Sequence, residues 1–147
     1  MSYVQNFLHC VWGTKNRTPF FTEKNRLEIL DHIRENCKRK NIHLDHINVH
    51  REHAHCLLAL HADQTLKKTI QLIKGESSFW INGTRLVKGR FEWADEYYGV
   101  SVGISQIDRV REYIRNQQKH HRRKSWADEC AEFLRAIKGA LPENPHG

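Results

Sequence analysis

The sequence predicts an α+β fold, and two observations lead to this class. The spacing of apolar residues alternates between a period of two and a period of about 3.6, in the order strand, helix, strand, strand, helix, strand, helix. The chain has 147 residues, of which 39% are hydrophobic and 28% charged, as in an ordinary single globular domain. This order is that of a ferredoxin-like split βαβ sandwich, with helices on one face of an antiparallel sheet. We expect the other face to be open for a site.

The first third of the chain supplies a strand and a helix. Residues 3–14 mix aromatic and β-branched side chains, which predicts a strand, and residues 13–19 carry turn residues. Thr22 can cap the helix that follows, and Asn41 can end it. The apolar residues of this helix recur every three or four positions: Leu27, Leu30, Ile33 and Cys37.

Two strands are then expected to pair as a hairpin. Residues 42–50 alternate, and a short turn at Arg51 and Glu52 leads into the strand of residues 53–60. Side chains alternate faces along a strand, so His53 and His55 project from one face. Cys56, Leu58 and Leu60 project from the other face and can fill a core.

The second half supplies a helix, a strand and a further helix. Residues 63–65 can cap a helix whose apolar positions run from 66 to 81, and Asn82-Gly83 can end it. Residues 91–102 are aromatic and β-branched and predict the fourth strand. Ser105 and Asp108 form a plausible capping box for the last helix of the sandwich. The apolar stripe of that helix is Ile107, Val110 and Ile114.

Charge and cysteine content limit the class of partner and the compartment. The net charge of +7 favours polyanions, and nucleic acid is the most plausible of these. The four cysteines are far apart and form no Cys-x-x-Cys pair, which argues against a zinc ribbon. The sequence has no signal peptide and no long apolar run. We therefore expect a cytoplasmic protein without a membrane partner.

Two stretches carry residues suited to chemistry. His53 and His55, one strand pitch apart, form an open two-pronged metal clamp that leaves positions for a third ligand and a substrate. On a helix, Tyr113, Gln117 and His120 share one face, at the rim of the packed surface. Taken singly, each stretch has an ordinary alternative: solvated or hydrogen-bonded histidines, and a tyrosine at the edge of the core.

Together, the two stretches resemble the single-tyrosine HUH transposases of bacterial insertion sequences, the IS200-like class that includes the REP-associated tyrosine transposases. The His-hydrophobic-His motif is met by His53-Ala54-His55, and the Tyr-Ile-x-x-Gln-x-x-His-His motif by residues 113–121. Further matches lie at residues 74–78, 80–82, 91–93 and 101–102. The resemblance covers residues 3–124, so we expect a catalytic domain over 1–124 and a helical extension and tail over 125–147. One departure is Arg51-Glu52, where the family often has Pro-Asp.

The resemblance implies a metal-dependent endonuclease and strand transferase for single-stranded DNA. Tyr113 would be the nucleophile, forming a 5′-phosphotyrosine link, and His53, His55 and Gln117 would bind Mg²⁺ or Mn²⁺. The substrate implied is an insertion sequence with hairpin ends, which the enzyme would excise and insert. One tyrosine per site and two cuts argue for a homodimer, whose sites could form in cis or in trans.

Basic residues outside the apolar stripes are candidate contacts to the DNA backbone, which would make binding sensitive to salt. They are Lys67, Lys68, Lys74, Arg85, Lys88, Arg90, Arg122, Arg123 and Lys124. Two other functions fit the same sequence. One is a domesticated relative that processes chromosomal palindromes, and the other is a ferredoxin-like nucleic-acid-binding module without catalysis.

Overall fold

The computed structural model describes residues 2–117, 128, 131–132 and 135. Its elements follow the predicted order. They are β1 (Phe7–Gly13), η1 (Lys15–Arg17), α1 (Arg26–Arg39), β2 (His43–His50), β3 (His53–Ala59), α2 (Leu66–Thr84), β4 (Tyr98–Val102), η2 (Ile104–Gln106) and α3 (Ile107–Arg115). Within the described part of the chain, no helix combines the length and apolarity that crossing a bilayer requires.

The four strands form one antiparallel sheet in the order β2-β3-β1-β4. This order confirms the ferredoxin-like class, because β1 and β3 are the two central strands and each βαβ half contributes one edge strand. The β2–β3 hairpin is also confirmed, with His50 opposite His53. Its turn contains Arg51 in the left-handed region, at φ 45°.

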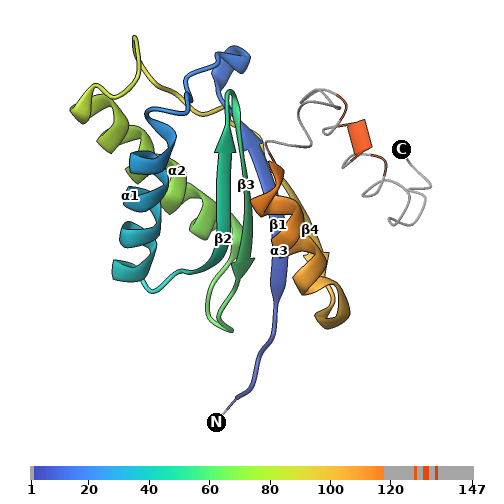
Figure 1. The fold of residues 1–147 in the computed structure, drawn as a ribbon. Helices are drawn as coiled ribbons and strands as arrows, with labels where there is room; N and C mark the ends of the chain where they lie inside the picture. Colours follow the sequence, from blue (N-terminus) through green and yellow to red (C-terminus); the bar gives the residue numbers. More distant parts are fainter. Residues whose placement is uncertain (1, 118–127, 129–130, 133–134, 136–147) are drawn as a thin grey trace, which may run out of the picture.

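Helices lie on both faces of the sheet (Figure 1). On one face, α1 and α2 cover the main core, to which the central strands contribute Cys10, Trp12, Cys56 and Leu58. On the other face, α3 packs against Leu57 of β3 through Ile107 and Ile114. The face that the sequence left open for a site is therefore partly covered by α3, and the candidate residues lie between this helix and the sheet.

Helix α2 is longer than its sequence signals indicate. Thr65 caps its start, with the hydroxyl oxygen accepting a hydrogen bond from the Lys68 backbone N–H. Its end lies at Thr84 rather than at Asn82-Gly83, with Arg85 in the left-handed region at φ 56°. The Asn82 carboxamide instead donates to the Phe91 carbonyl (2.9 Å) and accepts from the Phe91 N–H (2.7 Å). This asparagine therefore fixes the following loop and does not terminate the helix.

The fourth strand is shorter than predicted. Only Tyr98–Val102 pairs with β1, and the preceding segment makes a single isolated bridge, from Trp93 to Thr14. The Trp93 indole N–H donates to Ser77 Oγ (2.9 Å) on α2, and Lys74 of the same helix binds three backbone carbonyls of the segment. The aromatic rings of Phe91 and Trp93 thus lie in the main core and do not extend the paired strand. They pack against the rings of Trp12, Phe20 and Phe21.

The start of α3 also differs from prediction. Ser105 lies within the 3₁₀ turn η2, and the helix begins at Ile107 without a side-chain cap. Asp108 accepts a hydrogen bond from Arg111 (3.0 Å), three residues further along the helix. The proposed capping box is therefore replaced by an ion pair within the first turns of α3.

Candidate active site

The two histidines of the His-x-His stretch lie on the face of β3 that α3 covers. The strand alternates as predicted, with Ala54 and Cys56 in the main core and His53, His55 and Leu57 on the opposite face. Both imidazoles are fully buried. A buried imidazole needs defined hydrogen-bond partners, so the neighbours of these two rings are informative.

Helix α3 carries Tyr113 to the edge of this histidine pair. The centroids of the Tyr113 and His55 rings are 5.6 Å apart in an edge-on arrangement. The side chain of Tyr113 is half-buried and belongs to the small apolar cluster around Leu57. The phenol thus combines a fixed position with partial access from outside.

Gln117 forms a hydrogen bond with His53, the other histidine of the pair. Helix α3 ends at Arg115, Asn116 forms its C-cap, and Gln117 follows in helical conformation. Its carboxamide is fully buried, and Nε2 donates a hydrogen bond to His53 Nε2 at 2.8 Å. The structure therefore brings together the four residues Tyr113, Gln117, His53 and His55. His120 and His121 lie outside the described residues.

Polar contacts with β2 hold α3 in this position. Arg111 donates from Nε and Nη2 to the two carboxylate oxygens of Asp45, at 2.8 and 2.7 Å. These hydrogen bonds lower the pKa of Asp45 below its ordinary value. Further along, the Asn48 carboxamide donates to the Ile114 carbonyl at 2.9 Å. A bidentate ion pair and a buried hydrogen bond thus flank Tyr113 and set its height above the sheet.

Two neighbours of the histidines were not predicted as site residues. His9 of β1 is buried, its Nε2 lies 3.0 Å from His55 Nδ1, and its ring packs edge-on against Tyr113. Glu52 accepts from His53 Nδ1 at 3.3 Å. The period-two alternation of the first strand could have placed His9 on one face with Phe7 and Val11. It could not show that this face adjoins the His-x-His strand.

The comparison of the sequence with protein families decides the identity of the chain. Residues 2–117 match the family model described as transposase, IS200-like. The chain belongs to this family. Its members are DNA-cleaving and strand-transferring enzymes, so the protein is a transposase. None of the curated proteins matches the sequence closely enough to report.

Two solved structures share the fold of this transposase. One is a crystal structure of a candidate transposase from Deinococcus radiodurans R1, with a TM-score of 0.64 at 21% identity over 80% of this chain and 95% of that one. The other is a REP-associated tyrosine transposase bound to a REP hairpin, with a TM-score of 0.61 at 16% identity over 82% of this chain and 72% of that one. At these identities the likeness shows a common fold.

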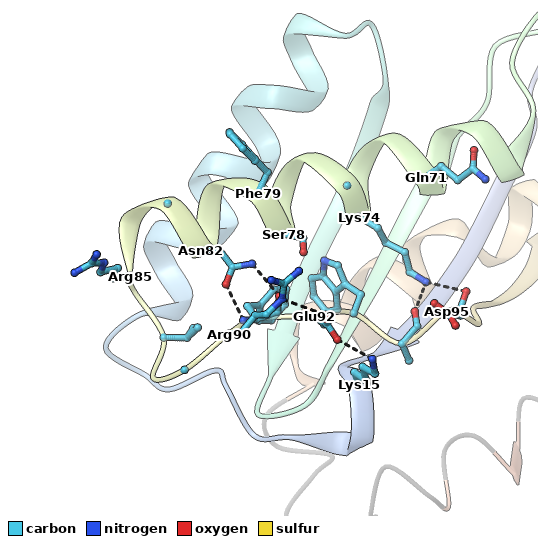
Figure 2. A pocket seen from close by; sticks show the side chains of 17 residues that line it. Lys15, Gln71, Lys74, Ser78, Phe79, Asn82, Arg85, Arg90, Glu92 and Asp95 are labelled. Carbon is cyan, nitrogen blue, oxygen red and sulfur yellow. Dashed lines mark hydrogen bonds and ion pairs between the residues drawn. The ribbon is translucent and has the colours of Figure 1, made fainter.

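The basic residues of the transposase fall into two groups. Those with exposed side chains are Lys67, Lys68, Arg85, Lys88 and Arg90. Lys74 is instead half-buried, and its Nζ donates to the carbonyls of Ala94 (2.7 Å) and Asp95 (3.3 Å), as Figure 2 shows. It also donates to the carbonyl of Glu96 (3.2 Å). Burial lowers the pKa of this amine. Lys74 is thus a structural residue, and Arg122, Arg123 and Lys124 lie outside the described residues.

The surface has two hollows of interest, one beside the candidate basic residues and one beside Tyr113. The larger, of about 1300 Å³, lies between α2 and the loop of residues 85–95 (Figure 2), where Glu92 pairs with Lys15 at 2.9 Å and with Arg90 at 3.2 Å. The smaller, of about 420 Å³, lies beside Tyr113 between β4 and α3. Its walls are mainly apolar, with Val100, Val102 and Val110, and Arg109 also lines it. This second hollow gives the phenol an open side.

The candidate metal ligands are two imidazoles and one carboxamide. Among residues 2–117 and the few described beyond them, no three His, Cys, Asp or Glu side chains form a metal-binding group. Imidazole nitrogen and amide oxygen are nevertheless donors that Mn²⁺ accepts, whereas Mg²⁺ prefers oxygen. A site with so few protein ligands would leave coordination positions for water and a DNA phosphate.

Proposed function

We propose that this transposase is a metal-dependent single-stranded DNA endonuclease and strand transferase that acts through a 5′-phosphotyrosine link to Tyr113. One observation carries the proposal. Within a single chain, the Tyr113 ring lies against His55 while the Gln117 carboxamide lies against His53. Two segments that are distant in sequence thus meet at one point, where a nucleophile and candidate metal ligands are close together.

The residues fit a divalent ion, with His53, His55 and Gln117 as its ligands. The side chains of all three are fully buried and converge between α3 and β3. The Gln117 nitrogen now faces His53, and turning the carboxamide over would offer its oxygen in the same place. Bound there, Mg²⁺ or Mn²⁺ would neutralise and polarise a non-bridging phosphate oxygen.

Tyr113 would attack the phosphorus in line. The bond from phosphorus to the Tyr113 oxygen forms and the bond from phosphorus to the 3′ oxygen breaks. The phenol proton passes to water, and the leaving 3′ oxygen takes a proton from water. The products are a 5′-phosphotyrosine and a 3′-OH. Attack by another 3′-OH reverses the step and joins new strands, so the phosphodiester energy is conserved and no ATP is needed. The hollow beside Tyr113 is large enough for a nucleotide next to the scissile bond.

The proposed substrate is single-stranded DNA with hairpin ends, carried by an insertion sequence that the enzyme excises and inserts. Two points support it: the REP-associated relative was solved with a REP hairpin, and the net charge is +7. Excision needs two cuts and hence two tyrosines, for which we propose a homodimer. Its place of action would be the cytoplasm, where bacterial DNA lies.

The decisive experiment replaces the nucleophile. Labelled single-stranded hairpin DNA is incubated with protein, with and without Mn²⁺, and resolved on a denaturing gel. Tyr113→Phe should abolish the covalent protein–DNA adduct while binding persists, because phenylalanine keeps the ring and removes the attacking oxygen. Tyr97→Phe, on the opposite face of the sheet, is the matched control. Undiminished adduct in Tyr113→Phe, or hairpin binding without cleavage by the wild type, would refute the proposal.

A further inference from the structure

We propose that His9 and Glu52 are positioning residues that hold both candidate metal-binding imidazoles, His55 and His53, in the tautomer that directs Nε2 to the ion. The inference rests on the proposed function, because it deepens the account of the same centre. It concerns His9, which is no part of the family resemblance, and Glu52, which stands where the family often has Asp.

His9 engages the Nδ1 of His55. Strands β1 and β3 are adjacent, with His9 opposite Leu57, so the His9 ring lies diagonally next to that of His55. The His9 Nε2 and His55 Nδ1 atoms are 3.0 Å apart, a hydrogen-bond distance, and both side chains are buried. The same His9 ring packs against Tyr113, with centroids 5.9 Å apart. One side chain of β1 thus touches both the candidate ligand and the candidate nucleophile.

Glu52 engages the Nδ1 of His53. It lies in the β2–β3 turn, directly before β3, and its Oε1 is 3.3 Å from His53 Nδ1. The Glu52 carboxylate is mostly buried, with 19% of its side chain exposed. Its backbone carbonyl accepts a hydrogen bond from the Thr14 N–H at 2.7 Å. This bond ties the turn to the end of β1 and fixes the direction from which the carboxylate approaches.

The two contacts have the same consequence for the protons. A carboxylate only accepts hydrogen bonds, so the His53 proton lies on Nδ1 and Nε2 carries the lone pair. This is consistent with Nε2 accepting a hydrogen bond from Gln117. If His9 accepts from His55 Nδ1 in the same way, Nε2 of His55 also carries the lone pair. Both imidazoles are then ready to bind a metal through Nε2 without a change of tautomer.

Removing a residue that hydrogen-bonds to a metal-binding histidine typically changes metal affinity by about 10- to 100-fold. Glutamine at position 9 offers an amide oxygen near the place of Nε2, whereas leucine offers no acceptor. His9→Leu should therefore weaken Mn²⁺ binding by about 10- to 100-fold, and His9→Gln should retain most of the affinity. Glu52→Gln should cause an intermediate loss, because a neutral amide oxygen is a weaker acceptor than a carboxylate.

Two measurements test the inference. Mn²⁺ affinity is measured by electron paramagnetic resonance of the unbound ion for wild type and variants, with His61→Leu, an exposed histidine, as the control. The tautomers are read in the metal-free protein from ¹⁵N chemical shifts of the histidine rings, at a pH where the imidazoles are neutral. We expect the Nδ1–H tautomer at His53 and His55 in the wild type, and a mixed or Nε2–H tautomer at His55 in His9→Leu.

The outcomes separate the inference from the proposed function. If His53→Ala abolishes Mn²⁺ binding while His9→Leu binds as the wild type does, the inference is wrong and the metal site stands. The inference is also wrong if His9→Gln and His9→Leu lose affinity equally with lowered melting temperatures, because His9 would then act through packing alone. If the wild type binds no Mn²⁺, or His53→Ala binds it fully, both the metal site and the role of His9 and Glu52 are refuted.

Discussion

At the scale of single residues, Lys74 shows how a basic side chain in a candidate DNA-binding surface can have a structural role. Its amine donates to three consecutive carbonyls of the segment before β4. We predict that Lys74→Met lowers the free energy of unfolding by about 1–3 kcal/mol, because three backbone carbonyls lose a charged donor. Chemical denaturation measures the change. Lys67→Met, at an exposed position about two turns earlier on α2, should change stability by less than about 0.5 kcal/mol.

The same two substitutions should have the opposite effects on DNA binding, where Lys67 rather than Lys74 is expected to matter. An exposed cation that contacts a phosphate contributes about one unit to the dependence of log affinity on log salt concentration. Lys67→Met should therefore reduce that slope, and Lys74→Met should leave it unchanged. If Lys74→Met reduced the salt dependence of DNA binding without changing stability, Lys74 would be a DNA contact rather than a structural residue.

The sequence predicted the residues whose roles depend on local pattern. The alternation of the hairpin strand correctly directed Cys56 and Leu58 to the core and His53 and His55 to the other face. The contacts of His9 and Lys74 could not be predicted in this way. They depend on which strand lies beside β1 and on how the loop after α2 folds back, and both are properties of the assembled chain.

At the scale of elements, the position of α3 depends on a few polar contacts with β2. Arg111 binds both carboxylate oxygens of Asp45, and Asn48 binds the Ile114 carbonyl. We predict that Arg111→Met increases amide hydrogen exchange in α3 by about tenfold while exchange in β1 and β3 is unchanged. Arg109→Met, an exposed arginine on the same helix, is the matched control. Unchanged exchange in Arg111→Met would mean that apolar packing alone holds α3.

The pH dependence of this contact has a defined sign. Arg111 lowers the pKa of Asp45 from its ordinary value of 3.8. The contribution of the Asp45–Arg111 pair to stability is therefore fully present above pH 3.8, the pKa of Asp45 in the unfolded chain. It is lost as the pH falls through the lower pKa of the folded state. Opening of α3 in the wild type should thus increase only in strong acid. In Asp45→Asn this acid-dependent part should be missing.

Helices and strands were predictable where nearby residues determine them. They were less predictable where contacts with distant residues compete with the local sequence pattern. The cap at Thr65 correctly predicted the start of α2. In α1 the spacing correctly predicted Leu30, Ile33 and Cys37 as buried, but Leu27 is exposed and Ile29 is buried in its place. The N-cap of α1 is Asn25 rather than Thr22. The segment of residues 91–97 has the side chains of a strand, but its backbone carbonyls bind Lys74 of α2. Composition alone does not reveal whether a carbonyl will be satisfied by a neighbouring strand or by a side chain.

At the scale of the whole molecule, the order of strands and helices was sufficient to predict the ferredoxin-like topology. The placement of α3 was not predictable, because its contacts join residues distant in sequence, such as Asp45 and Arg111, which are 66 residues apart. This placement bears on a question the sequence left open, whether a site is built in cis or in trans. In the structure α3 packs on β2 and β3 of its own chain, and Tyr113 meets His55 of the same subunit.

We therefore predict that the sites assemble in cis, and complementation between two inactive variants tests this. Differently tagged His55→Ala and Tyr113→Phe subunits are co-expressed, and the mixed species is purified through both tags. With cis assembly, every site lacks either the imidazole or the phenol, so no covalent adduct with hairpin DNA should form. With trans assembly, one site of a mixed dimer would contain both groups, and about half of the wild-type adduct should return. Adding Arg111→Met to the His55→Ala subunit tests whether the ion pair with Asp45 enforces cis assembly. If the ion pair with Asp45 is what keeps α3 on its own sheet, loosening it should allow Tyr113 to reach a partner, and adduct should then appear in the mixed species alone.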